Sequence, residues 1–268
     1  MNTKPKAKVK NDILKISKKV LIVFAILTMI LTLMGNYNNS FARSRRRKTI
    51  NITSVDESYS IKNFKIDAKV TETNEILIRE EMDVSFEYDK HGIYRVIPEK
   101  NTIVSDGKKQ KVEARVRNIK VNAPYTSTEQ DGYKILKIGD KNKTISGDQK
   151  YIIEYTYSIQ KYNTNDGIDE FYFNVLGDKI NTTVGNLEFK IEFPKGYQKD
   201  NVYMYAADAV FDINDKTTEK TEGLVKITET SENAISGKID TEIEPFTAVT
   251  LKGKLGKDYF KARNPYTD

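Results

Sequence analysis

Apolar and polar residues alternate with a period of two from residue 59 onward. In "NFKIDAKV" (63–70) every second residue is apolar, and "EILIREEMDVSFEY" (75–88) repeats the pattern after a turn at "TETN". Successive side chains of a strand point to opposite faces, so these segments predict strands with one buried and one wet face. The residues expected to face inward are Phe64, Ile66, Ala68, Val70, Ile76, Ile78, Met82, Val84, Phe86 and Tyr88.

The same alternation recurs along the chain, in "VEARVRNIKV" (112–121), "YIIEYTYSIQ" (151–160), "NLEFKIEF" (186–193), "GLVKITE" (223–229) and "FTAVTLKGKL" (246–255). Short strands separated by polar turns are typical of antiparallel sheets packed face to face. We therefore predict an all-β antiparallel β-sandwich over residues 58–256. Two smaller sandwiches divided near residues 185–200 are the second interpretation, and a helix is left open only for "YMYAADAVFD" (203–212).

The first 42 residues have the order of a secretory signal: a lysine-rich segment, an uncharged apolar run from Val20 to Met34, and a polar stretch ending in "NNSFA". As a helix the apolar run spans about 22 Å, short of the roughly 30 Å hydrocarbon core of a bilayer. We interpret residues 1–42 as a signal peptide cut after Ala42. The alternative is an uncleaved anchor that contacts the membrane through residues 20–34, and both place the body outside the cytoplasm.

The remaining boundaries follow from composition and charge. Residues 43–57, which begin "RSRRRK", are predicted to be a basic linker, and residues 257–268 a C-terminal tail. The net charge of +6 belongs to residues 1–42, and the chain after Lys48 carries a net charge of −5. A body of that sign does not attract phosphate backbones, so we expect no nucleic-acid partner.

The chemistry open to the chain is narrow, since it has no cysteine and one histidine. Disulfides, thiol catalysis and the usual zinc ligand sets are excluded. His91 lies in "DKHGIYRVIPEK" (89–100), where Gly92 can supply a turn and Pro98 ends an extended segment. No G-x-S-x-G motif accompanies it. We therefore interpret His91 as a turn residue and assign no catalytic residue, metal or cofactor.

A second dense cluster is "NDGIDEFYFNVLGD" (165–178). Its acids Asp169 and Glu170 are suited to metal binding or to general acid and base chemistry, but also to a solvated turn that enters a buried strand. We favour the turn. A buried pair between Arg95 and one of these acids is a further hypothesis.

Several segments together resemble a known family. "YSIKNFKIDAKVTETNEILIREEMDVSFEYDKHGIYRVIP", "GDQKYIIEYTYSIQ" and "DEFYFNVLGD", in this order, are similar to the extracytoplasmic domain of the domain-of-unknown-function-2207 family of predicted bacterial membrane proteins. The resemblance implies an exported all-β domain, normally membrane-anchored, with no assigned enzymatic activity. The chain departs from it at Phe173, where the family has tryptophan. The matching residues, a candidate binding or structural motif, are Gly92, Tyr94, Arg95, Pro98, Asp169, Glu170, Asn174 and Gly177.

Three functions remain open. The first is an exported, envelope-associated, non-enzymatic β domain that binds a protein or an envelope polymer, for which the 16 tyrosines predict an exposed tyrosine-bearing face. The second is a carboxylate-dependent hydrolase of cell-wall glycans, which needs two carboxyl groups about 5 to 9.5 Å apart in a groove. The third is a structural spacer.

Overall fold

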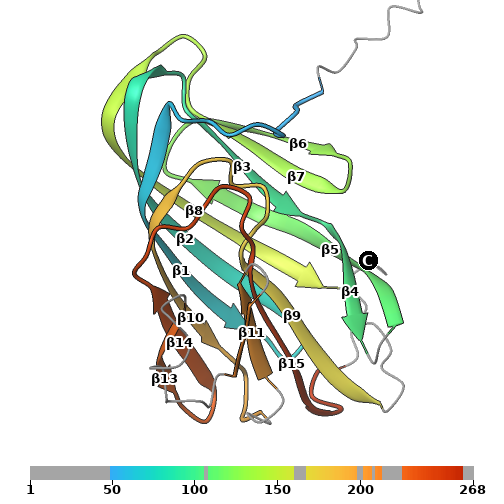
Figure 1. Ribbon diagram of the computed structural model, residues 1–268. Coiled ribbons are helices and arrows are strands. Elements are labelled where there is room, and N and C mark those ends of the chain that lie inside the picture. Colours follow the sequence, from blue (N-terminus) through green and yellow to red (C-terminus); the bar gives the residue numbers. More distant parts are fainter. Residues whose placement is uncertain are drawn as a thin grey trace, which may run out of the picture. The chain divides into compact units, whose positions relative to one another are not determined.

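The computed structural model describes residues 49–105, 108–159, 167–197, 202–206, 209–212 and 225–261. The expected signal peptide or anchor lies outside these residues. All regular elements of the described part are strands, which confirms the all-β class (Figure 1). No helix among the described residues is long and apolar enough to cross a membrane.

Eight strands form a large sheet in the order β13–β14–β10–β1–β2–β8–β5–β4. Their bounds are β1 Tyr59–Val70, β2 Glu75–Lys90, β4 Lys100–Ser105, β5 Lys108–Val121, β8 Ile145–Ile159, β10 Val184–Glu192, β13 Lys226–Thr230 and β14 Ala234–Ile239. The long strands β1, β2 and β8 form its centre. Neighbouring strands are antiparallel except β1 and β10, which are parallel. The prediction of antiparallel pairing throughout is therefore wrong at this position.

Two smaller sheets complete the fold. One has the order β12–β11–β15–β9 and the other β3–β7–β6. Their bounds are β3 Ile93–Pro98, β6 Tyr125–Gln130, β7 Tyr133–Ile138, β9 Ile168–Leu176, β11 Val202–Ala206, β12 Ala209–Asp212 and β15 Val249–Lys257. The segment "YMYAADAVFD", for which a helix was left open, contains the paired strands β11 and β12.

Both small sheets cover the same face of the large sheet. The ring of Phe173 on β9 packs against that of Tyr157 on β8, with the centroids 6.4 Å apart, and Arg95 of β3 contacts Glu80 of β2. Tyr157 pairs with Ile76, which lies four residues from Glu80 on the same face of β2. The large sheet therefore has an inner face under the two small sheets and an outer face that no other sheet of the described residues covers.

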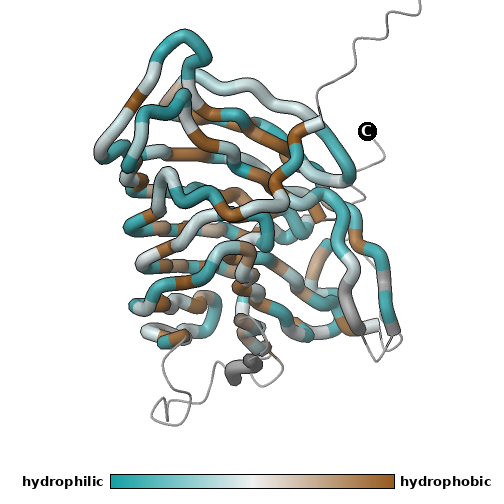
Figure 2. Tube along the Cα trace, turned by 45° about the horizontal axis from the view of Figure 1, so that its top comes forward, coloured by the Kyte–Doolittle hydropathy of each residue, from teal (hydrophilic) through white to brown (hydrophobic). Residues whose placement is uncertain are grey.

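The predicted alternation is confirmed along the central strands, where Figure 2 shows hydrophobic and hydrophilic positions succeeding one another. All the residues expected to face inward on β1 and β2 are buried except Tyr88, which is 67% exposed. The pairing of β2 with β8 shifts between Phe86 and Lys90. This irregularity breaks the period of two, so the expectation for Tyr88 is wrong.

Candidate functional site

A buried ion pair joins the three-stranded sheet to the large sheet. Arg95 donates from Nε and Nη2 to the two carboxylate oxygens of Glu80, each over 2.7 Å. The Tyr155 hydroxyl on β8 donates to Glu80 Oε1 over 2.7 Å, and Arg95 Nη1 donates to the Val96 carbonyl over the same distance. The side chains of Arg95 and Glu80 are 5% and 1% exposed. The network is thus closed to solvent.

The environment fixes the protonation states of Arg95 and Tyr155. Burial alone would lower the pKa of Arg95, but the Glu80 carboxylate raises it above its usual value. Burial, aided by the same carboxylate, raises the pKa of the Tyr155 hydroxyl well above its usual value. Neither group exchanges protons near neutral pH. A fully paired, water-excluded network fits the positioning of a sheet rather than catalysis.

The acid that pairs with Arg95 comes from β2, so the hypothesis of a pair with Asp169 or Glu170 is wrong. Asp169 lies on β9, where its Oδ2 accepts the backbone N–H of Phe260 over 2.8 Å. Glu170 is also buried and lies opposite Lys254 of β15. These acids face other elements of the four-stranded sheet and its continuation.

The two sequence motifs nevertheless meet at Gly177. A Cβ placed on Gly177 would lie 3.8 Å from Arg95 Nη1, so the end of the second motif touches the centre of the first. Asn174 lies on β9, three residues before Gly177, and its Oδ1 accepts a hydrogen bond from the Thr250 hydroxyl over 2.8 Å. The motif residues therefore join strands to one another.

Gly92 is required by close backbone approach. Its φ is 134°, and a Cβ there would lie 1.8 Å from the Ile138 carbonyl oxygen. Gly139 faces it with the same φ and the same kind of conflict, with the His91 carbonyl. His91 itself is exposed and donates Nδ1–H to the Lys143 carbonyl over 2.9 Å. The structure places it in a turn, as predicted.

The remaining motif residues do not build a tyrosine-bearing face. Tyr94 is 41% exposed, whereas Pro98 is buried and its carbonyl accepts the Tyr157 hydroxyl over 2.8 Å. Tyr94 and the 37%-exposed Tyr125 pair with adjacent residues of β7, whose side chains point to opposite sides. The third strongly exposed tyrosine, Tyr88, lies on β2 in another sheet. These three tyrosines share no face, but the partly exposed Tyr172 of β9 and Tyr203 and Tyr205 of β11 lie on one face of the four-stranded sheet, which gives a tyrosine-bearing surface away from the motif residues.

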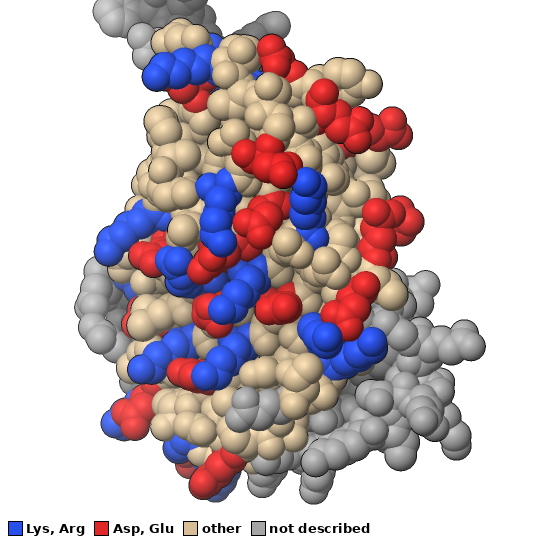
Figure 3. All heavy atoms as spheres, turned by 90° about the vertical axis from the view of Figure 1, so that its left-hand side faces the viewer, with Lys and Arg blue, Asp and Glu red and all other residues tan. Residues whose placement is uncertain are grey.

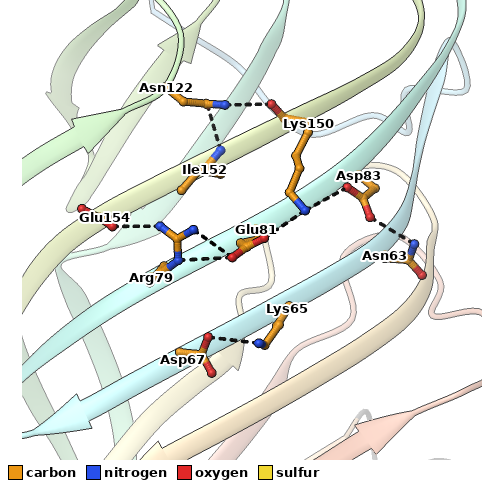
Figure 4. Close-up of polar contacts among 10 residues, drawn as sticks. All are labelled: Asn63, Lys65, Asp67, Arg79, Glu81, Asp83, Asn122, Lys150, Ile152 and Glu154. Carbon is orange, nitrogen blue, oxygen red and sulfur yellow. Dashed lines mark hydrogen bonds and ion pairs between the residues drawn. The ribbon is translucent and has the colours of Figure 1, made fainter.

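The outer face of the large sheet carries charges that alternate along and across the strands, and Figure 3 shows basic and acidic side chains interspersed. Arg79 of β2 donates to Glu81 and to Glu154 of β8 (Figure 4). A hydrogen bond from Lys150 holds the pKa of Glu81 below its usual value. Opposite charges also face each other on β1 and β10, as Lys65 and Glu188, Asp67 and Lys190, and Lys69 and Glu192.

A groove of about 560 Å³ crosses this face. Leu77 lies in it and is 47% exposed, an apolar side chain among charges. The sequence pattern alone did not indicate this groove, although the outward residues already alternate in sign along β1 and β10. The lining includes four cations, Lys69, Arg79, Lys120 and Lys190, and three acids, Asp67, Glu154 and Glu192.

A second cleft, of about 750 Å³, contains two carboxylates at one ammonium group. Lys134 Nζ lies 3.7 Å from Glu99 Oε1 and also pairs with Glu129. Burial raises the pKa of Glu99, and the hydrogen bond from Lys134 lowers the pKa of Glu129. Asp169 and Glu170 line neither cleft. Among the described residues, no group of three or more histidine and acidic side chains is arranged to hold a metal ion.

In its described part, the chain is therefore an all-β domain. Its buried ion pair joins two sheets, and its charged outer face is open to solvent. The chain belongs to the family described as predicted membrane protein (DUF2207), N-terminal domain, whose model matches residues 60–237. This confirms the resemblance seen in the sequence and supports association with a membrane. No curated protein matches the chain.

Solved structures give distant likenesses only. An M1 zinc metallopeptidase from Deinococcus radiodurans is 7% identical, with a TM-score of 0.37 over 75% of this chain and 43% of that chain. Native yeast LTA4 hydrolase is 10% identical, with a TM-score of 0.43 over 80% and 32%. A putative protease from Parabacteroides distasonis is 6% identical, with a TM-score of 0.38 over 74% and 41%. This chain spans less than half the length of each of these proteins, and TM-scores below 0.5 do not establish a common fold.

Proposed function

We propose that this chain is the extracytoplasmic, non-enzymatic binding domain of an envelope-associated protein, and that its partner lies in the groove on the outer face of the large sheet. The observation that carries the proposal is Leu77, 47% exposed in a groove whose lining is mainly charged. The family of predicted membrane proteins and the leader-like order of residues 1–42 support the location.

The groove suits binding because its floor is rigid. It is formed by central strands whose other face is the buried core, so side chains on it are held in register before a partner arrives. A preorganised surface loses little conformational entropy on association. Leu77 then supplies apolar contact, and the surrounding charges supply orientation.

The absence of cysteine from the sequence makes a direct test possible, because Leu77→Cys would introduce a unique thiol. We expect a membrane-impermeant maleimide to label this variant in intact cells that produce the full chain. We also expect labelling in cells to be slower, by about five-fold or more, than labelling of the purified variant, because the partner covers the groove.

Tyr94→Cys is the matched control, since Tyr94 is 41% exposed on a different sheet and should react at the same rate in both settings. Equal rates for Leu77→Cys in cells and in purified protein would mean that the groove is empty, as in a structural spacer. Labelling only after lysis would contradict the extracytoplasmic location.

The rival hydrolase is favoured by one observation, the carboxylate pair at Lys134. The partly buried Glu99, with a raised pKa, lies near Glu129, with a lowered pKa, which is the arrangement of a general acid and its partner. If this function holds, the purified full chain cleaves cell-wall glycan and Glu99→Gln abolishes the cleavage. Glu113→Gln, a change in the same cleft, would leave it intact. No cleavage by the unaltered chain would exclude the rival.

A further inference from the structure

We infer that the occupant of the outer-face groove is an extended, phosphate-bearing anionic polymer, held by Lys69 and Lys120. The inference rests on the proposed function, since it names the partner of the same groove. It begins with the ion pairs of the lining. Each of the three lining acids has its own cation: Asp67 pairs with Lys65, Glu154 with Arg79, and Glu192 with Lys190.

Two cations of the groove are left over. In the part of the chain that the structure describes, Lys69 and Lys120 form no ion pair; Lys69 only lies near enough to Glu192 to lower its pKa further. Both lysines are exposed. The other charged groups that line the groove are paired, so these two lysines give it a local excess of positive charge, which complements an anion.

The register sets how these two charges are spaced. Lys69 on β1 pairs with Leu77 on β2, which pairs with Thr156 on β8. Lys120 on β5 pairs with Glu154 on β8, one row away, and a bulge between Arg117 and Lys120 brings it into that row. Three strand spacings separate β1 from β5, which is about 14 Å at about 4.8 Å per spacing. Leu77 lies between the two lysines.

A ligand that reaches both lysines must be elongated and must carry repeated negative charge. A small anion would meet one lysine only, whereas a polymer can place charges on both and an uncharged section over Leu77. Lysine is a point charge with rotatable donors, suited to phosphate, while planar carboxylate groups are matched best by the arginine fork. The only arginine of the lining, Arg79, is occupied by Glu81 and Glu154.

The body's net charge of −5 makes the inference specific, because it gives no general attraction for polyanions. The test is binding of fluorescently labelled inorganic polyphosphate to the purified full chain in detergent, with labelled polyglutamate as the carboxylate probe. The double variant Lys69→Gln, Lys120→Gln is compared with Lys137→Gln, Lys141→Gln, which removes two exposed lysines on and beside β7. The seven lysines of residues 1–19 and the basic residues 43–48 are present in every variant, so their contribution to binding is the same throughout.

We expect the groove variant to lose about five-fold in polyphosphate affinity per lysine, about 25-fold together, and the control variant less than two-fold. The slope of log affinity against log salt should fall by about 1 to 2 in the groove variant only. Equal losses in the two variants, or tighter binding of polyglutamate than of polyphosphate to the groove, would overturn the inference. Thiol protection at position 77 in cells without polyphosphate binding would overturn it as well, and would leave the proposed function standing.

Discussion

At the scale of single residues, Glu80 is the buried acid that links two sheets of the fold. It occupies an inward position of β2, between Ile78 and Met82, where alternation predicts an apolar side chain. A charged residue in such a position signals a buried partner, and the sequence contained that signal. The partner could not be identified from the sequence, because Arg95 and Glu80 meet only where two sheets pack together. The density of motif residues, on which the pair with Asp169 or Glu170 was predicted, carries no information on that packing.

Removing the charge of Glu80 should be strongly destabilising. Glu80→Gln leaves Arg95 buried at 5% side-chain exposure without a counter-charge, and such a change costs about 3 to 5 kcal/mol. Urea unfolding of the full chain, followed by tyrosine fluorescence, measures the loss. Glu81→Gln is the control on the outer face of the same strand and should cost less than about 1 kcal/mol, because its ion pairs are solvated. Equal effects of the two changes would contradict the assigned burial.

At the scale of elements, alternation located the strands but not their neighbours. Leu187, Phe189 and Ile191 were expected to share one face of a strand and do so on β10, yet nothing in their spacing tells that β10 lies parallel to β1. Pairing direction depends on where the intervening chain travels, here through β9 in another sheet. For the same reason the outer-face groove, built from five strands, could not be assembled from local patterns.

Asp169 ties the four-stranded sheet to the segment after β15. Asp169→Ala leaves the buried N–H of Phe260 without its acceptor, which should cost about 1 to 3 kcal/mol. Hydrogen exchange at Phe260 should accelerate by a larger factor than at Leu251 in the middle of β15. Asp169→Asn keeps an acceptor oxygen and should restore part of the protection. Unchanged exchange in Asp169→Ala would show that this bond does not hold the segment.

Asp56 fixes the segment before β1 to the end of β2, and its effect depends on pH. Burial works against its charged form, but hydrogen bonds from Lys90 and Ser58 outweigh burial and lower its pKa. A carboxyl group whose pKa is lowered in the folded state stabilises the fold at pH values above its unfolded-state pKa, about 3.9 for Asp. That stability is lost as the pH falls through the folded-state pKa. We expect Asp56→Asn to cost about 1 kcal/mol at pH 7 and almost nothing near pH 2. A cost that does not change between these pH values would contradict the charge effect.

At the scale of the whole molecule, positive charge is concentrated in the N-terminal segment, and the chain after Lys48 is negative. Seven lysines precede the apolar run and five basic residues follow it at 43–48, and this excess of lysine before the run favours an N-terminus in the cytoplasm, as the proposed function requires. The apolar run is short for a permanent span, and Ser40 and Ala42 offer small residues for cleavage. We therefore expect protein recovered outside the cytoplasm to have an intact mass that begins at Arg43.

Fractionation of producing cells followed by intact-mass measurement distinguishes the alternatives for this address. Full-length protein in the membrane fraction would make residues 20–34 an anchor, and the groove would then be confined to partners within reach of the membrane surface. A chain that begins at Arg43 keeps "RSRRRK" as its first residues, which adds a second cationic element to the lysines of the groove. Full-length protein in the soluble cytoplasm would contradict both, because the envelope partner on which the proposed function depends would be out of reach.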